Sequence, residues 1–195
     1  MAFYLISIIG MDALICVLNL LFNKFNLSSI HIILASVLGA LGVIFIDAIV
    51  ALFVRRVLPE KYFTYKNQKF CASKKECKFY EKIGIKNWKD KVVELGMFTN
   101  FSKKSVANPE SKEYVERFIL ECNYGSEIHI LSVFIGYVLI FFYPLKYALC
   151  FALPIATVNA FLNLLPFMIL RYNVERLSRL RNILEKKENR SNLSS

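Results

Sequence analysis

The sequence predicts an all-α polytopic membrane protein with four transmembrane helices, a cytoplasmic cap of helical and irregular segments, and a C-terminal amphipathic helix. Two observations support this fold class. Hydrophobic residues make up 56% of the 195 residues and are concentrated in long stretches with few charges. Basic residues, which give a formal net charge of +10, are concentrated between and after those stretches. This alternation is typical of chains that cross a membrane several times.

Four apolar stretches are candidates for membrane crossing, because a helix needs about 20 apolar residues to span roughly 30 Å of hydrocarbon. They occupy about residues 2–22, 30–54, 129–145 and 147–170. The first lacks a basic leader and carries Asp12 in its middle, so we expect a retained helix rather than a signal peptide. The third is the shortest, and it reaches Leu145 if Tyr143 and Pro144 lie in the far interface.

The distribution of basic residues predicts the orientation. Of the 25 Lys and Arg, 16 lie in the polar segment 55–128, seven lie in the tail 171–195, and only Lys24 and Lys146 lie in the two short turns. The positive-inside rule therefore places the segment, the tail and both termini in the cytoplasm. We predict a single membrane domain, 1–195, in which the polar segment forms a cytoplasmic cap.

The positive charge favours contact with anionic membrane lipids. It predicts no nucleic-acid partner, because the basic residues are interleaved with acids and no recognition motif is present. The five cysteines are an odd number, so no disulfide framework is predicted. Cys71 and Cys77, with five residues between them, lack the usual zinc spacing, and we expect neither a metal nor a cofactor.

Two further polar segments have competing interpretations. Trp88, the only tryptophan, is followed by Lys89 and Asp90, and we assign these three residues to substrate binding. Anchoring in the headgroup layer is an equal alternative, because tryptophan rings and lysine side chains prefer that depth. In the tail, apolar residues at helical spacing predict an amphipathic helix on the cytoplasmic leaflet, with disorder from about Glu188.

Two clusters of functional side chains border the third and fourth spans, and the topology places both at one membrane face. They are Glu121, Glu127 and His129 before the third span, and Arg171, Tyr172 and Asn173 after the fourth. General acid–base catalysis needs a base, a group that orients it, and donors for the negative charge that develops on the reacting group. His129 is the candidate base, Glu127 or Glu121 the orienting carboxylate, and Arg171 with Asn173 the donors to an oxyanion or phosphate.

This assignment has structural alternatives. A histidine at a helix start often serves headgroup or backbone groups, and an Arg-Tyr pair after a span is an ordinary interfacial anchor. Glu121 and Glu127 are six residues apart, about 120° out of alignment on a helix, so they need a break near Gly125 or a broad pocket to act together.

A polar layer is predicted inside the spans. Asp47 lies eight residues before Arg55 and Asn163 eight residues before Arg171, which places both about 12 Å below the cytoplasmic boundary. Asn159 lies one turn deeper than Asn163. An intramembrane carboxylate is costly unless it is paired or hydrated, so Asp47 and Asn163 are assigned to substrate binding. Interhelical hydrogen bonding that only stabilises the bundle is the alternative.

Several runs of the chain, in order, are similar to one family. They are Gly84-Ile85-Lys86-Asn87-Trp88-Lys89-Asp90, Ser102-Lys103-Lys104, Glu121 to Glu127 with His129, Asn163-Leu164-Leu165-Pro166-Phe167, Arg171-Tyr172-Asn173 and Arg176-Leu177. The chain thereby resembles the glycosyl-4,4'-diaponeurosporenoate acyltransferase family of small bacterial membrane proteins. The resemblance implies transfer of a fatty acyl group to a hydroxyl of a glycosylated lipid or isoprenoid, with an acyl donor such as acyl-CoA as co-substrate, at the bacterial cell membrane.

Two other classes stay open. A non-enzymatic lipid-binding, transport-accessory or scaffold protein would use the same polar groups to hold its helices together. A metal-dependent variant would use Glu121, Glu127 and His129 as ligands, but it lacks a clear fourth ligand. Convergence of His129 with a carboxylate and with donors distinguishes an enzyme from a scaffold.

Overall fold

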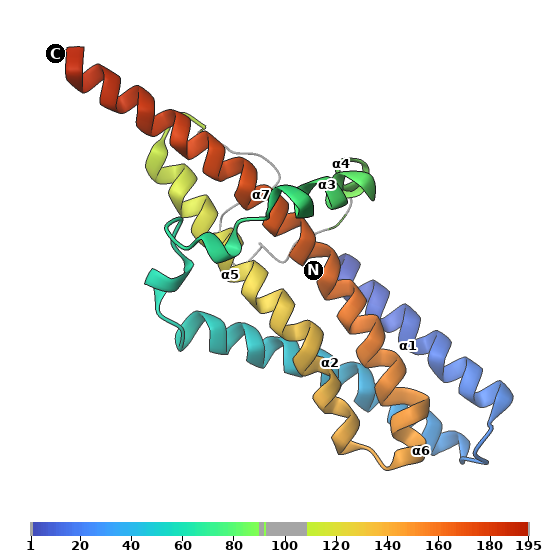
Figure 1. Ribbon diagram of the computed structural model, residues 1–195. Coiled ribbons are helices and arrows are strands. Elements are labelled where there is room, and N and C mark those ends of the chain that lie inside the picture. The colour runs from blue at the N-terminus through green and yellow to red at the C-terminus, as the bar shows by residue number, and fades with distance from the viewer. Residues whose placement is uncertain (1, 90–91, 93–108, 195) are drawn as a thin grey trace. The chain divides into compact units, whose positions relative to one another are not determined.

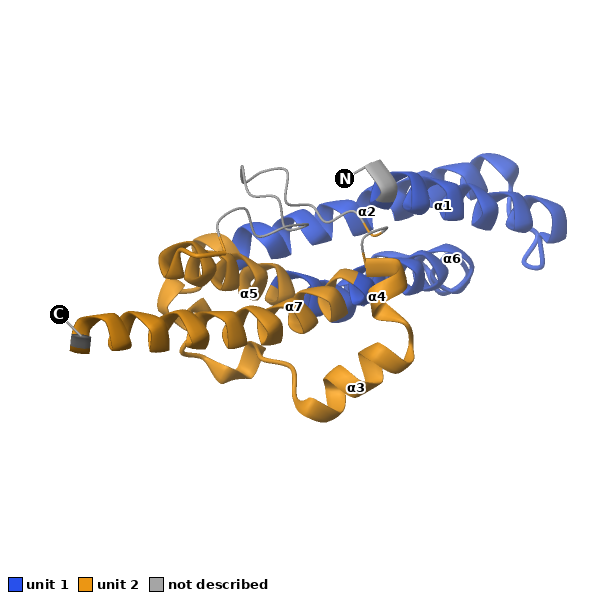
Figure 2. Ribbon diagram, turned by 90° about the horizontal axis from the view of Figure 1, so that it is seen from above, with its two compact units in different colours: residues 1–54, 128–165 blue, residues 55–127, 166–195 orange. Residues whose placement is uncertain are grey.

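The computed structural model describes residues 2–89, 92 and 109–194, and this part of the chain is helical and contains no strand (Figure 1). The chain divides into two compact units (Figure 2). Unit 1 comprises residues 1–54 and 128–165, and unit 2 comprises residues 55–127 and 166–195. Asp90 and the run 102–104, which the sequence analysis singled out, lie outside the described residues.

The four predicted spans are confirmed as helices long and apolar enough to cross a membrane. The first is α1 (Ala2–Phe22), and the second is α2 (Ser29–Arg56). The third combines α5 (Lys112–Ile135) with the 3-10 helix η5 (Gly136–Phe142). The fourth begins with α6 (Leu145–Tyr147) and the π-helix η6 (Ala148–Ala152) and continues as α7 (Leu153–Ser194).

In unit 1, α1 and α2 form an antiparallel hairpin that turns at residues 23–28 (Figure 1). In this turn the backbone of Asn23 and Asn26 has positive φ angles (29° and 51°), which asparagine tolerates better than most residues. The outer faces of both helices carry large apolar side chains in the open, such as Leu21 at 72% and Phe45 at 66% exposure. Apolar surface of this extent fits contact with lipid tails.

Unit 1 has an aliphatic core with few aromatic rings. Its buried members are Ile8, Ile15, Ile32, Ala35, Ala40, Val43, Leu139, Phe151, Ala152 and Ile155. Gly42 allows close packing there, because a Cβ at this position would lie 2.6 Å from Leu139 Cδ1. Small residues at such crossings let membrane helices approach one another.

In the described residues of the polar segment, unit 2 contains four short helices. These are the 3-10 helices η1 (Glu60–Phe63) and η2 (Gln68–Phe70) and the α-helices α3 (Lys74–Lys82) and α4 (Ile85–Trp88). Ser73 and Glu76 form a capping box at the start of α3, each side chain bonding the other's backbone N–H. Gly84, at φ 74°, lets the chain turn directly from α3 into α4.

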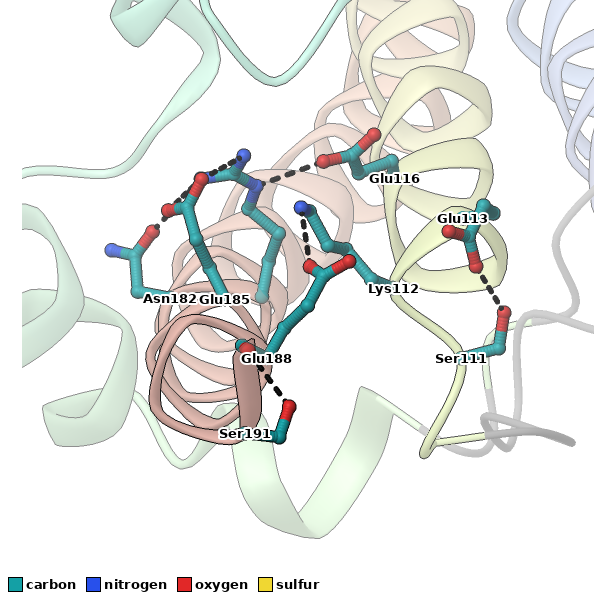
Figure 3. A network of polar contacts seen from close by, with 9 residues as sticks. Ser111, Lys112, Glu113, Glu116, Asn182, Glu185, Glu188 and Ser191 are labelled. Carbon is teal, nitrogen blue, oxygen red and sulfur yellow. Dashed lines mark hydrogen bonds and ion pairs between the residues drawn. The ribbon is translucent and has the colours of Figure 1, made fainter. Parts of the chain in front are cut away.

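Within unit 2, the early part of α5 and the later part of α7 run antiparallel and are joined by ion pairs (Figure 3). Arg181 bonds Glu116 and Glu185, and Lys112 bonds Glu188. We call these five residues the clasp. The helix continues to Ser194, so the prediction of disorder from about Glu188 is wrong. Contacts across the clasp explain why the polar end of the chain stays helical.

Candidate functional site

A chain of polar side chains runs through the interior of unit 1 from α5 to α7 and α2. His129 Nδ1 lies 2.8 Å from Asn163 Oδ1, and Asn163 Nδ2 donates to Asp47 Oδ2 at 3.0 Å. His129 and Asn163 are buried, with 9% and 4% exposure. The structure thus brings together three predicted site residues, one from the proposed catalytic set and two from the proposed binding set.

Tyr4 and Asn159 extend this chain around the carboxylate of Asp47. The Tyr4 hydroxyl lies 2.9 Å from Asp47 Oδ2 and 2.7 Å from Asn159 Oδ1, and Asn159 Nδ2 donates to Asp47 Oδ1 at 3.1 Å. Asn163 Nδ2 also lies 3.1 Å from Asn159 Oδ1. Three donor groups therefore face one carboxylate, which is the pairing that a carboxylate inside a membrane requires.

The local sequence explains how these residues meet. Asn159 and Asn163 are four residues apart on α7 and hence on one face of the helix. Gly136 leaves room for them, because a Cβ there would lie 3.1 Å from Asn159 Nδ2. The predicted common layer of Asp47 and Asn163 is confirmed by their direct hydrogen bond. Their assignment to substrate binding stays a prediction.

The hydrogen bonds favour one tautomer of His129, with the proton on Nδ1. Because Asp47 accepts, the amide nitrogen of Asn163 points toward Asp47 and its carbonyl oxygen points toward His129. An oxygen acceptor at Nδ1 requires Nδ1 to be the donor. The neutral ring then has its lone pair on Nε2, as a general base needs.

Arg171 lies in a different environment, within unit 2. Its guanidinium forms a fork with Glu76, with Nε–Oε1 at 2.6 Å and Nη2–Oε2 at 2.9 Å. It also donates to the carbonyl oxygens of Lys69 and Cys71, at 2.9 and 3.3 Å. Arg171 therefore ties α7 to the polar segment. Its predicted role as a donor to an oxyanion or phosphate stays a prediction, and it requires exchange of Glu76 for the substrate anion.

The Glu76 carboxylate is held in its charged form by this fork. Burial acts to raise its pKa, but hydrogen bonds from Arg171 and Tyr80 outweigh burial, so the pKa of Glu76 lies below its usual range. Burial and then the hydrogen bond to Glu76 raise the pKa of the Tyr80 hydroxyl, although Arg171 acts to lower it. Glu76 and Arg171 thus form a lasting ion pair at neutral pH.

The other predicted binding residues of unit 2 lie near this fork. Tyr172 is buried and its hydroxyl donates to Glu81 Oε1 at 3.0 Å. The indole Nε1 of Trp88 donates to the carbonyl oxygen of Ile83 at 3.1 Å, and Trp88 packs against the small core that includes Tyr172. Lys89 and Asn173 are half-buried. Packing inside unit 2 accounts for the positions of Tyr172 and Trp88, so neither position requires a bound substrate.

Glu121 and Glu127 do not act as a pair on a broken helix, because α5 is continuous through Gly125. Glu121, at 3% exposure, accepts from Arg55 at 3.1 Å and from Arg117 at 3.2 Å. Glu127 is half-buried. Their predicted pairing with His129 stays a prediction. In the described part of the chain, no group of three or more His, Cys, Asp or Glu side chains is arranged to hold a metal ion.

Two residues of these polar contacts were not predicted from the sequence. Glu76 forms the signature Ser73-x-x-Glu76 of a capping box, a pattern that predicts a helix start but not a partner 95 residues away. Tyr4 was not predicted to join the site, because a tyrosine near the end of a span is usually an interfacial anchor.

The fold and the site define an all-helical membrane protein in which an amide and a carboxylate orient a buried histidine. The family model described as glycosyl-4,4'-diaponeurosporenoate acyltransferase matches residues 59–183, well over half of the chain, and the chain belongs to this family. The resemblance predicted from the sequence is confirmed, and membership supports an acyltransferase-like role in a membrane. No curated protein and no solved structure matches the chain in the corresponding comparisons.

Proposed function

We propose that this protein transfers a fatty acyl group to a hydroxyl of a glycosylated lipid or isoprenoid at the cytoplasmic face of the bacterial cell membrane. The observation that carries the proposal is the hydrogen-bonded series of His129, Asn163 and Asp47 in a family of acyltransferases. A histidine held in one tautomer by a carboxylate or an amide on one of its ring nitrogens recurs in acyl-transfer sites.

The chemical step follows from the orientation of His129. Nε2 takes the proton of the acceptor hydroxyl while the hydroxyl oxygen attacks the acyl carbonyl carbon and forms the new C–O bond. Collapse of the tetrahedral intermediate breaks the bond to the leaving group. For a thioester donor such as acyl-CoA, the departing thiolate receives the proton from His129, and the products are the ester and the free thiol.

Asn163 and Asp47 act as positioning residues in this scheme. Asn163 keeps the His129 ring in the required tautomer, and Asp47 keeps the amide of Asn163 in the orientation that does so. Tyr4 and Asn159 complete the coordination of the Asp47 carboxylate. The apolar surroundings strengthen each of these hydrogen bonds, because competing water is excluded.

Lipid profiling by mass spectrometry tests the proposal in producing cells. The cells express wild type, His129→Ala or Asp12→Asn at matched protein levels. Asp12 is a fitting control because it is a buried carboxylate of the first span and accepts from Ser36 Oγ at 2.8 Å. A lipid that gains an acyl mass with wild type and Asp12→Asn, but not with His129→Ala, supports the transferase and identifies its acceptor. Identical lipidomes in all three strains favour the scaffold or transport alternative.

A further inference from the structure

An open hollow of about 610 Å³ lies on unit 2, in the segment that follows α2. Its lining residues are Lys61, Tyr62, Thr64, Tyr65, Lys66 and Asn67. The lining residues include two lysines and two tyrosines and no acidic residue. Small-molecule sites commonly have volumes of roughly 300–1,000 Å³, so the hollow has the size of a ligand site.

The two lysines of the hollow differ from three arginines of the same unit, which are paired with carboxylates. Arg55, Arg171 and Arg181 of the same unit each form an ion pair with a glutamate. Within the described part of the chain, neither Lys61 nor Lys66 has a carboxylate within ion-pair distance. Two uncompensated ammonium groups beside one hollow favour an anionic ligand.

The two tyrosines of the hollow are held in place by contacts with neighbouring residues. Arg181 lies over the Tyr65 ring, with its Cζ 4.0 Å from the ring centroid, and Arg181 is itself anchored by the clasp. Tyr62 packs edge-on against Phe63 at 5.0 Å between centroids, and Asn67 Nδ2 donates to the Tyr62 carbonyl oxygen at 2.8 Å. Walls that are fixed in advance reduce the entropy lost when a ligand binds.

We propose that this hollow binds the phosphate groups of a phosphorylated ligand through Lys61 and Lys66, with Tyr62 and Tyr65 contacting the adjoining moiety. Phosphates supply the charge that the two lysines lack, and tyrosine rings suit either a planar base or the glycerol region of a headgroup. The ligand is a coenzyme A thioester or an anionic phospholipid. The coenzyme A source rests on the proposed function, whereas phosphate binding does not.

The test measures both sources with the purified full chain. Isothermal titration calorimetry at low salt measures binding of free coenzyme A in neutral detergent, and native mass spectrometry measures retention of phosphatidylglycerol relative to phosphatidylcholine. The variant is Lys61→Gln/Lys66→Gln. The matched control is Lys74→Gln/Lys75→Gln, which removes the same charge from two exposed lysines of α3.

We expect the hollow variant to weaken binding of one of the two ligands at least about tenfold, because it removes two positive charges beside the phosphate groups. Loss of coenzyme A binding identifies the donor, and loss of phosphatidylglycerol retention identifies a headgroup. Equal losses in both double variants, or no loss in either, overturn the proposal. His129→Ala separates the two ideas, because it abolishes transfer under the proposed function and leaves phosphate binding unchanged.

Discussion

Both carboxylate oxygens of Glu76 meet the guanidinium of Arg171, in a fork that joins α3 to α7 within unit 2. Arg171 donates four hydrogen bonds in all, two to Glu76 and one each to the carbonyl oxygens of Lys69 and Cys71. Such a planar donor set cannot be reproduced by lysine. Arg171 therefore stabilises the polar segment whether or not it also contacts substrate, and loss of activity in an Arg171 variant alone does not identify a binding residue.

The Glu76–Arg171 fork predicts acid sensitivity of unit 2. The pKa of Glu76 in the folded protein lies below its unfolded value, so its stabilisation is complete above the unfolded pKa and is lost as pH falls through the folded pKa. We expect the ion pair to contribute about 1–2 kcal/mol to the free energy of unfolding, reduced by its partial exposure. This contribution should be lost below roughly pH 4. Thermal unfolding in detergent, followed by the fluorescence of Trp88 between pH 7 and pH 3, measures this.

Glu76→Gln and Glu60→Gln make a matched pair for that experiment. Glu60 is exposed at the start of η1. Glu76→Gln should lower the unfolding temperature at pH 7 and flatten its dependence on pH, whereas Glu60→Gln should leave the wild-type profile unchanged. An unaltered profile in Glu76→Gln would show that other carboxylates govern the acid transition.

Asp47→Asn should reduce acyl transfer by about 100-fold to 10⁴-fold while leaving the size of the side chain unchanged. An asparagine at position 47 offers a single acceptor oxygen to the donors that now face the Asp47 carboxylate. The side-chain amide of Asn163 can therefore flip by about 180°. The turned amide presents N–H to His129 Nδ1, which moves the ring proton to Nε2 and removes the base. Initial rates of acyl transfer in detergent, with matched unfolding temperatures, measure this effect.

The control for Asp47→Asn is Asp12→Asn, which changes the carboxylate bonded to Ser36 and should retain the wild-type rate. Tautomer loss also predicts a changed dependence of the rate on pH, which general destabilisation of the bundle does not. Equal rate losses in both variants would assign Asp47 to structure rather than to positioning.

The clasp predicts that salt and single substitutions loosen the end of α7. Glu116→Gln removes the interhelical partner of Arg181, whose side chain is only 11% exposed. We expect amide exchange in residues 181–194 to accelerate about fivefold, because a partly buried ion pair contributes about 1 kcal/mol. Hydrogen exchange with mass spectrometry measures this at low and high salt.

Glu113→Gln is the control for the clasp. Glu113 lies on α5 three residues before Glu116 and accepts from Ser111 at 3.0 Å, a contact beside the start of the same helix (Figure 3). Its substitution should leave exchange at the end of α7 unchanged. If both variants accelerate exchange equally, the effect arises from lower net negative charge rather than from the Arg181 contact.

The sequence predicted the spans well because membrane crossing depends on the apolar content of about 20 consecutive residues, which is a local property. The same local geometry placed Asp47 and Asn163 in one layer, since depth along a helix follows from counting residues at 1.5 Å each.

Partner choice was decided only by the tertiary structure. The sequence alone established which residues are polar and at what depth, and it placed Arg171 and His129 in one candidate site. The structure gives Arg171 a partner 95 residues away in Glu76, and it gives His129 a partner 34 residues away in Asn163. The physical reason is that hydrogen bonds act over about 3 Å. Whether two groups come that close depends on how each helix is rotated and how the polar segment folds, and no local pattern of residues contains that information.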